Sequence, residues 1–496
     1  MAAGLYLLQS IAIMNDAPPA SPDAAVFADA SRNLLVTGHL GTDLVVGMSN
    51  NLYWQPPGYC LALAATFKVF GFGLWQLRLL SLVFGALCLW MVYELSLKVH
   101  ADQLASTIAV LMLSFDPLFA KWGRWDRMDP ICMFFVLLSL FSYLVALEKS
   151  GLRFHCAAGA SASAAVLVHP YGAISLAVIA LHAIFVRRPS VKGVLSFVSP
   201  VIVLLGGWAI YVAQAPGDFL VQMLYQVDRK LHHDPASLAG IFSQYRFYTL
   251  YLVVVTGALV SAFGFRKNPA GTGNALVAIA VLAVLCSYVV IKGPYYHTYL
   301  SPVLAIAAST SAARWLRSGQ PGTRRLAAIL LALLALNGVA YAGSISWLYR
   351  VKLRQEASHE VLVRQILECL PGDARIGHFG YPTPYWVLHR MNDTRKLREM
   401  YFLRPGHESE VFEGLDYLVF TQSSNPVSDQ RATKLDVDFS DVVLGREGKH
   451  LRFVALVGVE RTDAYRALIF SIENGYTMAD GGDLTVPRPA LRKVGN

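Results

Sequence analysis

Charged residues are scarce in this sequence. Only 15% of its 496 residues are Asp, Glu, Lys or Arg, whereas 55% are hydrophobic and the mean hydropathy is +0.45. A soluble globular chain carries about 25% charged residues. The composition therefore excludes an ordinary soluble protein and indicates a membrane protein.

Cysteine is scarce as well, with six residues spread over the whole chain. Small domains held together by disulfides need closely spaced cysteines, so we expect no disulfide framework. The region after residue 350 also lacks both standard phosphate-binding glycine loops. This absence argues against a second enzyme in that region.

Long apolar runs recur along the first 350 residues, and each is close to the length that crosses roughly 30 Å of hydrocarbon. They cover residues 79–97, 103–119, 130–147, 194–213, 247–265, 275–291, 299–316 and 326–347. Residues 156–186 add a hairpin of two shorter spans, broken at "HPYG". With an N-terminal run the sequence predicts about eleven crossings.

The N-terminal run, "MAAGLYLLQSIAIM", is short for a crossing, because as a helix it reaches only about 21 Å. We expect it to be tilted or to continue upstream. A cleaved signal peptide is less favoured, since no basic segment precedes the apolar core.

Basic residues fall in every second connection between the runs. They are Lys98, Lys149, Arg153, Arg187, Arg188, Lys192, Arg266, Lys267, Arg314, Arg317, Arg324 and Arg325. The positive-inside rule makes these connections cytoplasmic and puts the others outside, together with everything after the last run. The net charge of +9 then comes from these connections and favours attraction to anionic lipid rather than nucleic-acid binding.

Two amphipathic helices are expected in the first outer region, at about residues 22–72. "DAAVFADASRNLLVTGHLG" predicts a helix that lies along the membrane interface, with Asp29, Arg32 and Asn33 on its polar face, and that ends at Gly38. "YWQPPGYCLALAATFKVFG" predicts a second one, with prolines in its first turn and Gly71 after its end. By periodicity alone, both fit equally well as caps over a helix bundle.

An ordered series of short motifs runs from about residue 20 to residue 310. It comprises "DAAVF", "PPGYCLALA", "FKVFG", "RLLS", "RMDP", "HPYG" and "YYHTYLSP". The series resembles the GT-C glycosyltransferases of the protein mannosyltransferase and lipid A aminoarabinose transferase superfamily. The resemblance implies a mostly α, polytopic membrane helix bundle of GT-C type with a C-terminal soluble α/β domain. It also implies inverting transfer of a sugar from a polyprenyl-phosphate carrier to an acceptor on the outer face.

The resemblance further implies a catalytic base. Inverting transfer needs one carboxylate to take the acceptor's proton, and Asp23 occupies the position of the family's catalytic aspartate. Asp23 could instead, or in addition, be the N-cap of a helix that begins at Ala24. If it is only a cap, Asp29, Asp126 and Asp129 are the next candidates.

Cations are expected around the donor phosphate, which leaves as an anion and so needs no general acid. The outer cations placed to bind it are Arg124, Arg127, Lys292, His297 and Arg246. Two departures from the family pattern remove one acid and one cation: Ala24 stands where a glutamate is common, and Gln55 where a lysine is common.

Four further residues are expected to support the site: Asp129, Arg78, His169 and Tyr296. Asp129 would orient Arg127 or the surroundings of Asp23, and Arg78 belongs to the "RLLS" motif. His169 would contact the donor phosphate or form a structural turn, and Tyr296 would stack on a sugar or belong to an interfacial aromatic belt. Alternatively, the charges of "KWGRWDRMDP" form a solvated loop with local Arg–Asp pairs.

No obligatory metal is expected, although a divalent cation remains compatible with the sequence. His232 and His233 lie near Lys230 and Asp234, but this spacing matches no known metal site.

The composition changes after Arg350. "EASHEVLVRQILECLP" predicts an amphipathic helix whose apolar side holds Val361, Leu362, Ile366, Leu367 and Leu370. Strands are predicted at "ARIGHFG", "DYLVFTQ", "HLRFVALVGV" and "ALIFSI". We therefore divide the chain into a transmembrane domain at residues 1–349 and an α/β domain at residues 350–496, which is either an acceptor-recognition module or a docking appendage.

The function predicted is an integral-membrane glycosyltransferase of a bacterial inner membrane, with the C-terminal domain in the periplasm. Its partners would be a polyprenyl-phosphate-linked sugar, membrane lipids and an envelope glycolipid, glycan or protein acceptor. A lipid transporter or flippase is the alternative, but such proteins place ionisable residues at mid-membrane depth in repeated halves, and neither feature is found here. A binding-only member of the same fold is a third alternative, because Ala24 and Gln55 replace two expected residues.

Overall fold

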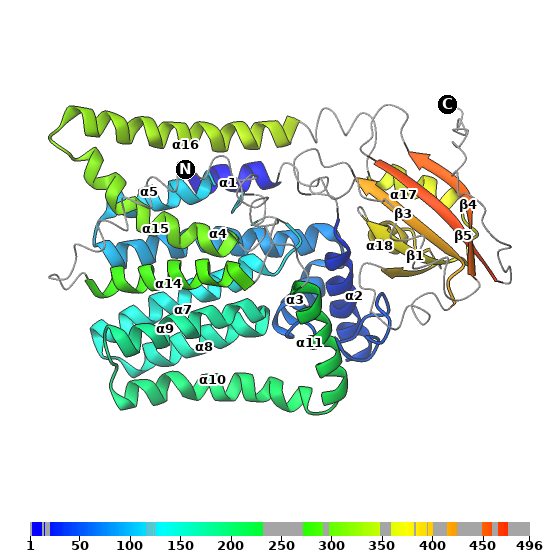
Figure 1. The fold of residues 1–496 in the computed structure, drawn as a ribbon, viewed down its shortest axis with the longest axis horizontal. Coiled ribbons are helices and arrows are strands. Elements are labelled where there is room, and N and C mark those ends of the chain that lie inside the picture. The colour runs from blue at the N-terminus through cyan, green and yellow to red at the C-terminus, as the bar shows by residue number, and fades with distance from the viewer. Residues whose placement is uncertain are drawn as a thin grey trace. The chain divides into compact units, whose positions relative to one another are not determined.

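The computed structural model divides into two compact units (Figure 1). The helical unit comprises Met1–Met14, Tyr53–Gly71 and Trp75–Ser346, and the α/β unit comprises Asn15–Leu52, Phe72–Leu74 and Trp347–Asn496. The structure describes residues 2–11, 14, 20–116, 119–120, 123, 125–231, 271–290, 297–347, 359–380, 383–393, 395–399, 414–423, 449–458 and 465–474.

The helical unit follows the apolar runs of the sequence. Its described elements are α1 (Ala2–Ile11), α3 (Gly58–Phe70), α4 (Leu74–His100), α5 (Gln103–Ser114), α7 (Asp129–Lys149), α8 (Leu152–Val168), the 3-10 turn η1 (Pro170–Gly172), α9 (Ala173–Phe185), α10 (Val191–Val212), α11 (Pro216–Leu231), α14 (Gly271–Val290), α15 (His297–Leu316) and α16 (Pro321–Trp347). Within the described residues, four helices are long and apolar enough to cross a membrane: α4, α7, α10 and α16. The break predicted at "HPYG" is confirmed by η1, whereas the run at 247–265 lies outside the described residues.

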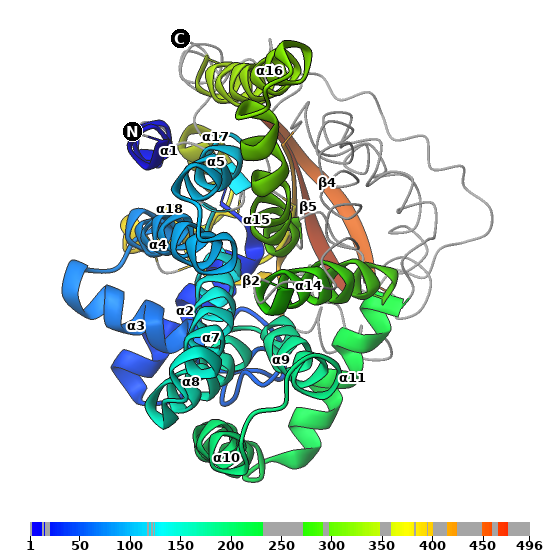
Figure 2. The ribbon, with the colours of Figure 1, turned by 90° about the vertical axis from the view of Figure 1, so that its left-hand side faces the viewer.

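Close helix packing in this unit depends on small side chains. Figure 2 views the helices end-on and shows α7, α8 and α9 packed together, with α10 beside α8 and α14 beside α9. At Gly159 on α8, an added Cβ would lie 2.0 Å from the carbonyl oxygen of Phe197 on α10. Only glycine therefore allows this approach.

Ion pairs join several predicted cytoplasmic connections at one end of the helical unit. Lys98 at the end of α4 pairs with Glu148 at the end of α7. Arg317, after α15, donates to both carboxylate oxygens of Asp102 at 2.6 and 2.9 Å, and Asp102 also caps the start of α5. Both ion pairs lie at the end of the bundle where α4 and α7 end and α5 begins (Figure 1).

The α/β unit contains a mixed sheet. Its described elements are α2 (Pro22–Thr37), α17 (His359–Glu368), α18 (Tyr385–Arg390), β1 (Arg375–Gly380), β2 (Lys396–Glu399), β3 (Tyr417–Ser423), β4 (Lys449–Gly458) and β5 (Tyr465–Asn474). The strand order is β2-β1-β3-β5-β4, with β1 parallel to β2 and β3, and β5 antiparallel to β3 and β4. The four predicted strands are confirmed; β2 and α18 were not predicted.

Helix α17 covers this sheet with an apolar face. Leu362, Ile366 and Leu370 recur every four residues and are buried in one core with Ile376 of β1. Val361, which the periodicity places on the same side, is 42% exposed instead. The buried face is therefore narrower than predicted.

Helix α2 was predicted to lie along the membrane interface, and its packing differs from that prediction. It belongs to the α/β unit, so this unit takes in residues 15–52 as well as the region after 347. Asp29, expected on the polar face, is buried, whereas Leu35 and Val36 are 44% and 72% exposed. The helix ends as predicted, at Gly38 in the left-handed region with φ +78°.

Candidate functional site

Asp23 lies in the first turn of α2 and does not cap the helix. The cap is Ser21, whose Oγ accepts the N–H of Ala24 at 3.0 Å, and the helix begins at Pro22. The alternative in which Asp23 caps a helix starting at Ala24 is therefore wrong. From Pro22 to Ser31 every residue is buried except Asp23, which is half-buried. The helix thus leaves one acidic side chain accessible in an otherwise packed segment.

Asp29 was the next candidate base, and hydrogen bonds occupy both of its oxygens. Oδ2 accepts from the Thr42 hydroxyl at 2.8 Å and from the Asp43 N–H at 3.1 Å, and Oδ1 accepts from the Tyr385 hydroxyl at 3.0 Å. Burial raises the pKa of Asp29, and the bonds from Thr42 and Tyr385 oppose that rise. These contacts give Asp29 a structural role in the α/β unit.

The charged stretch "KWGRWDRMDP" is largely buried where the structure describes it. Arg127 Nε donates to Asp129 Oδ2 at 2.7 Å, with the Arg127 side chain 11% exposed and Asp129 fully buried. The Ser81 hydroxyl donates to the carbonyl of Arg127 at 2.9 Å. The local Arg–Asp pair of the alternative interpretation is present, but it is buried rather than solvated. Asp129 contacts Arg127 as expected, and the role of this pair at a donor phosphate stays a prediction.

Tyr59 of α3 joins the same group, and the sequence analysis did not single it out. Burial raises the pKa of its phenol, Asp126 and Asp129 raise it further, and Arg127 lowers it. Tyr59 is fully buried, and its phenol is thus within electrostatic range of these three charges. The signal that points to it is the "PPGY" motif, in which only the prolines and their neighbour at 55 were interpreted.

The supporting residues Arg78 and His169 have structural contacts. Arg78 is fully buried in α4, and its Nη1 donates to the carbonyl of Met14 at 2.7 Å. Nδ1 of His169 accepts the N–H of Tyr171 at 3.0 Å and so caps η1. The structural-turn interpretation of His169 is confirmed for this nitrogen.

Gln55, which stands in place of a lysine, is buried. Its Nε2 donates to the carbonyl of Val168 at 2.5 Å, at the end of α8. A neutral amide here links the segment before α3 to the start of the "HPYG" turn. The phosphate-binding cation expected at this position is replaced by a packing contact.

The remaining predicted cations cannot be placed in the same way. Arg124, Arg246, Lys292 and Tyr296 lie outside the described residues. His297 begins α15, and its side chain is likewise outside the described part of the chain. Their roles stay predictions.

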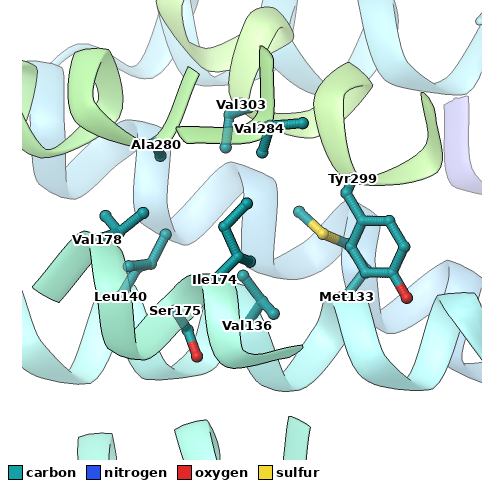
Figure 3. Close-up of a pocket in the computed structure, with 10 residues that line it drawn as sticks. All are labelled: Met133, Val136, Leu140, Ile174, Ser175, Val178, Ala280, Val284, Tyr299 and Val303. Carbon is teal, nitrogen blue, oxygen red and sulfur yellow. The ribbon is translucent and has the colours of Figure 1, made fainter. Parts of the chain in front are cut away.

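An apolar pocket lies between four helices of the helical unit (Figure 3). It is lined by Met133, Val136 and Leu140 of α7, Ile174, Ser175 and Val178 of α9, Ala280 and Val284 of α14, and Tyr299 and Val303 of α15. The Ser175 hydroxyl donates to the carbonyl of Gly172 at 2.8 Å and points away from the other lining side chains in Figure 3. The lining suits a hydrocarbon chain better than a sugar or a phosphate.

Sequence similarity to known proteins covers part of the chain. Residues 54–214 match the family model described as dolichyl-phosphate-mannose-protein mannosyltransferase. Over 274 residues the chain is 23% identical to undecaprenyl phosphate-alpha-4-amino-4-deoxy-L-arabinose arabinosyl transferase 1 of Proteus mirabilis. That match covers 50% of this chain and 47% of the relative, so it spans about half of the relative's length.

Structural similarity extends over nearly the whole chain. ArnT from Cupriavidus metallidurans superposes with a TM-score of 0.62 in its apo state and 0.59 bound to undecaprenyl phosphate. At 13% identity, the apo match covers 95% of this chain and 97% of ArnT, and the bound match covers 94% and 97%. The oligosaccharyltransferase of Archaeoglobus fulgidus gives a TM-score of 0.56 at 11% identity, over 84% of this chain and 69% of that one. These likenesses show a shared fold.

Proposed function

We propose that the chain is a member of the GT-C superfamily and that it is a membrane glycosyltransferase that moves a sugar from a polyprenyl-phosphate carrier to an envelope acceptor. The observation that carries the proposal is Asp23, an accessible carboxylate on a helix whose cap is already supplied by Ser21. The acceptor would be a lipid, a glycan or a protein.

Asp23 would act as the general base. Its carboxylate takes the proton of an acceptor hydroxyl, and the acceptor oxygen forms a bond to the anomeric carbon from the face opposite the phosphate. The bond between that carbon and the phosphate oxygen breaks, and the polyprenyl phosphate leaves with the electron pair. The anomeric configuration is inverted, and no metal or cofactor is needed to balance the step.

The donor phosphate would be bound by cations. Arg127 is the candidate whose setting is described, because Asp129 holds its guanidinium in a largely water-free position where ionic hydrogen bonds are strong. We propose Arg124, Arg246, Lys292 and His297 as its companions. The polyprenyl chain would lie along apolar surfaces of the helices, and the binding of undecaprenyl phosphate by ArnT supports this part of the proposal.

The orientation proposed places the basic end of the helical unit in the cytoplasm and a soluble α/β domain in the periplasm of a bacterial inner membrane. The ion-paired connections at one end of the bundle support it. In this arrangement the α/β unit would be available to an envelope acceptor.

The decisive experiment measures sugar transfer from a panel of synthetic polyprenyl-phosphate sugars by the purified protein in envelope-lipid extract. Asp23→Asn should lower kcat by about two to four orders of magnitude while leaving donor binding nearly unchanged. Asp43→Asn is the matched control, because Asp43 is an exposed acid of the same unit.

Transfer that persists at the wild-type rate in Asp23→Asn would remove Asp23 as the base. Donor binding without any transfer by the wild-type protein would instead favour a binding-only member of the superfamily.

A further inference from the structure

A buried polar network crosses the parallel strands of the α/β unit. Nδ1 of His378 on β1 lies 2.8 Å from Oε2 of Glu399 on β2, and its Nε2 lies 2.8 Å from the Thr421 hydroxyl on β3. The Thr383 hydroxyl donates to the other carboxylate oxygen, Oε1 of Glu399. All four side chains are buried. An apolar set of similar volume would stabilise a core as well or better, so stability alone does not account for this network.

The network also reaches the segment that carries α2. The N–H of Thr383 donates to the carbonyl of Ala20 at 3.3 Å, and the N–H of Glu399 donates to the carbonyl of Leu44 at 2.8 Å. Ala20 directly precedes the cap residue Ser21. The Thr383–Glu399 pair therefore holds the chain on both sides of α2.

A second contact holds α2 further along its axis. Asp29 accepts the Tyr385 hydroxyl at 3.0 Å, and it follows Asp23 by six residues, which is about 9 Å along a helix. A helix held just before its start, at Ala20, and again at Asp29 has its first turn fixed in position and in direction. The side chain at position 23 is thereby aimed by residues of the α/β domain.

We infer that Thr383, Glu399 and Tyr385 are positioning residues for Asp23, an inference that rests on the proposed function. They act on the reaction only through α2. A displacement of about 1 Å between reacting groups can cost on the order of 10²-fold in rate. Loss of either contact should therefore slow transfer without weakening donor binding.

The first test uses variants that remove a hydroxyl and little else. Thr383→Val and Tyr385→Phe should each lower kcat by about 10- to 100-fold and leave the donor KM within about twofold. Thr383→Ser, which keeps the hydroxyl, should restore most of the rate. Thr421→Val is the matched control, because it removes a hydroxyl from the end of the network away from Thr383; it should lower Tm without a comparable loss of kcat.

A double-mutant cycle separates positioning from general destabilisation. In the Asp23→Asn background there is no base to aim, so Thr383→Val should cause almost no further loss of kcat. An equal loss in both backgrounds would overturn the inference. If Thr383→Val does not fold, the same cycle with Tyr385→Phe decides the matter.

Hydrogen exchange gives a readout that does not depend on transfer. The amides in the first turns of α2 should exchange faster in Thr383→Val than in the wild type, and unchanged protection would contradict the inference. If the wild type transfers but the variants keep its kcat, the proposed function stands and the positioning role fails. If the wild type transfers nothing, the proposed function fails, while the exchange data still decide whether the network holds α2.

Discussion

Asp23 and Asp129 both lie in the first turn of a helix and next to a proline, in α2 and α7 respectively. Asp23 is half-buried and follows a serine cap, whereas Asp129 is fully buried and accepts a hydrogen bond from Arg127. The difference comes from their neighbours: Ser21 satisfies the helix start so that Asp23 need not, and Arg127 supplies a charge that Asp129 matches. Residue type and position in the helix therefore do not by themselves show whether an aspartate is available for catalysis or is part of the packed interior.

The largest expected difference between the two aspartates is in stability. Asp129→Ala removes the carboxylate that accepts a hydrogen bond from the largely buried guanidinium of Arg127, so it should lower the free energy of unfolding by about 3 to 5 kcal/mol. Asp23→Ala should lower it by only about 1 kcal/mol or less, since Asp23 is half-buried and Ser21 supplies the cap of the helix. Denaturant unfolding of both variants in the same detergent measures the contrast, and equal losses would contradict it.

Replacing both members of the buried pair should recover most of that loss. Arg127→Met alone leaves the buried carboxylate of Asp129 without this cation, whereas Arg127→Met with Asp129→Leu removes both charges of the pair. The double variant should be at least about 2 kcal/mol more stable than Arg127→Met and still bind donor poorly, because the proposed phosphate ligand is gone. Unfolding measurements on the two variants check the expected stability, and donor-binding measurements check the expected loss of binding. A double variant no more stable than the single one would refute the pairing.

Removing the serine cap tests whether Ser21, rather than Asp23, caps α2. Ser21→Ala should lower the stability of the α/β unit by about 1 kcal/mol, because the N–H of Ala24 loses its acceptor. Ser21→Asp keeps an acceptor and should restore the stability. Thermal unfolding of the three proteins is the measurement; if Ser21→Ala matched the wild type, Asp23 would be supplying the cap after all.

The smallest effect concerns a third aspartate on the same helix as Asp23. Burial raises the pKa of Asp29 above its ordinary value, so its contribution to stability is fully present at low pH and is lost as pH rises through the raised pKa. Asp29→Asn does not titrate. Relative to the wild type, this variant should therefore be more stable at about pH 8 than at about pH 4, and a difference in Tm that does not change with pH would contradict the burial effect.

Features set by neighbouring residues were predictable from the sequence. The apolar runs predicted α4, α7 and α10, and the pairing of Arg127 with Asp129 needs only two residues of separation. Even the cap at Ser21 had a signal, since serine followed by proline is typical of an N-cap and the first helical position.

Features that depend on distant contacts were not predictable. Asp29 was expected on a polar face, but it is buried, and its carboxylate accepts a hydrogen bond from Tyr385, which lies 356 residues further along the chain. Strand β2 is a four-residue polar stretch, "KLRE", whose pairing with β1 and whose buried Glu399 have no local signal. Hydropathy and periodicity describe each segment by itself, so they do not identify which buried acid acquires a distant partner.

The α/β unit is assembled from stretches that are far apart in the chain, so the ribosome makes its parts at different times. Residues 15–52 are synthesised roughly 300 residues before the sheet that completes their unit. At about 5 to 20 residues per second, α2 is made about 15 to 60 s before its partner strands exist. During that interval the helix bearing Asp23 has no sheet against which to fold. The proposed transferase would therefore become active only after the last strands have been translated, when every helix of the bundle has already been made.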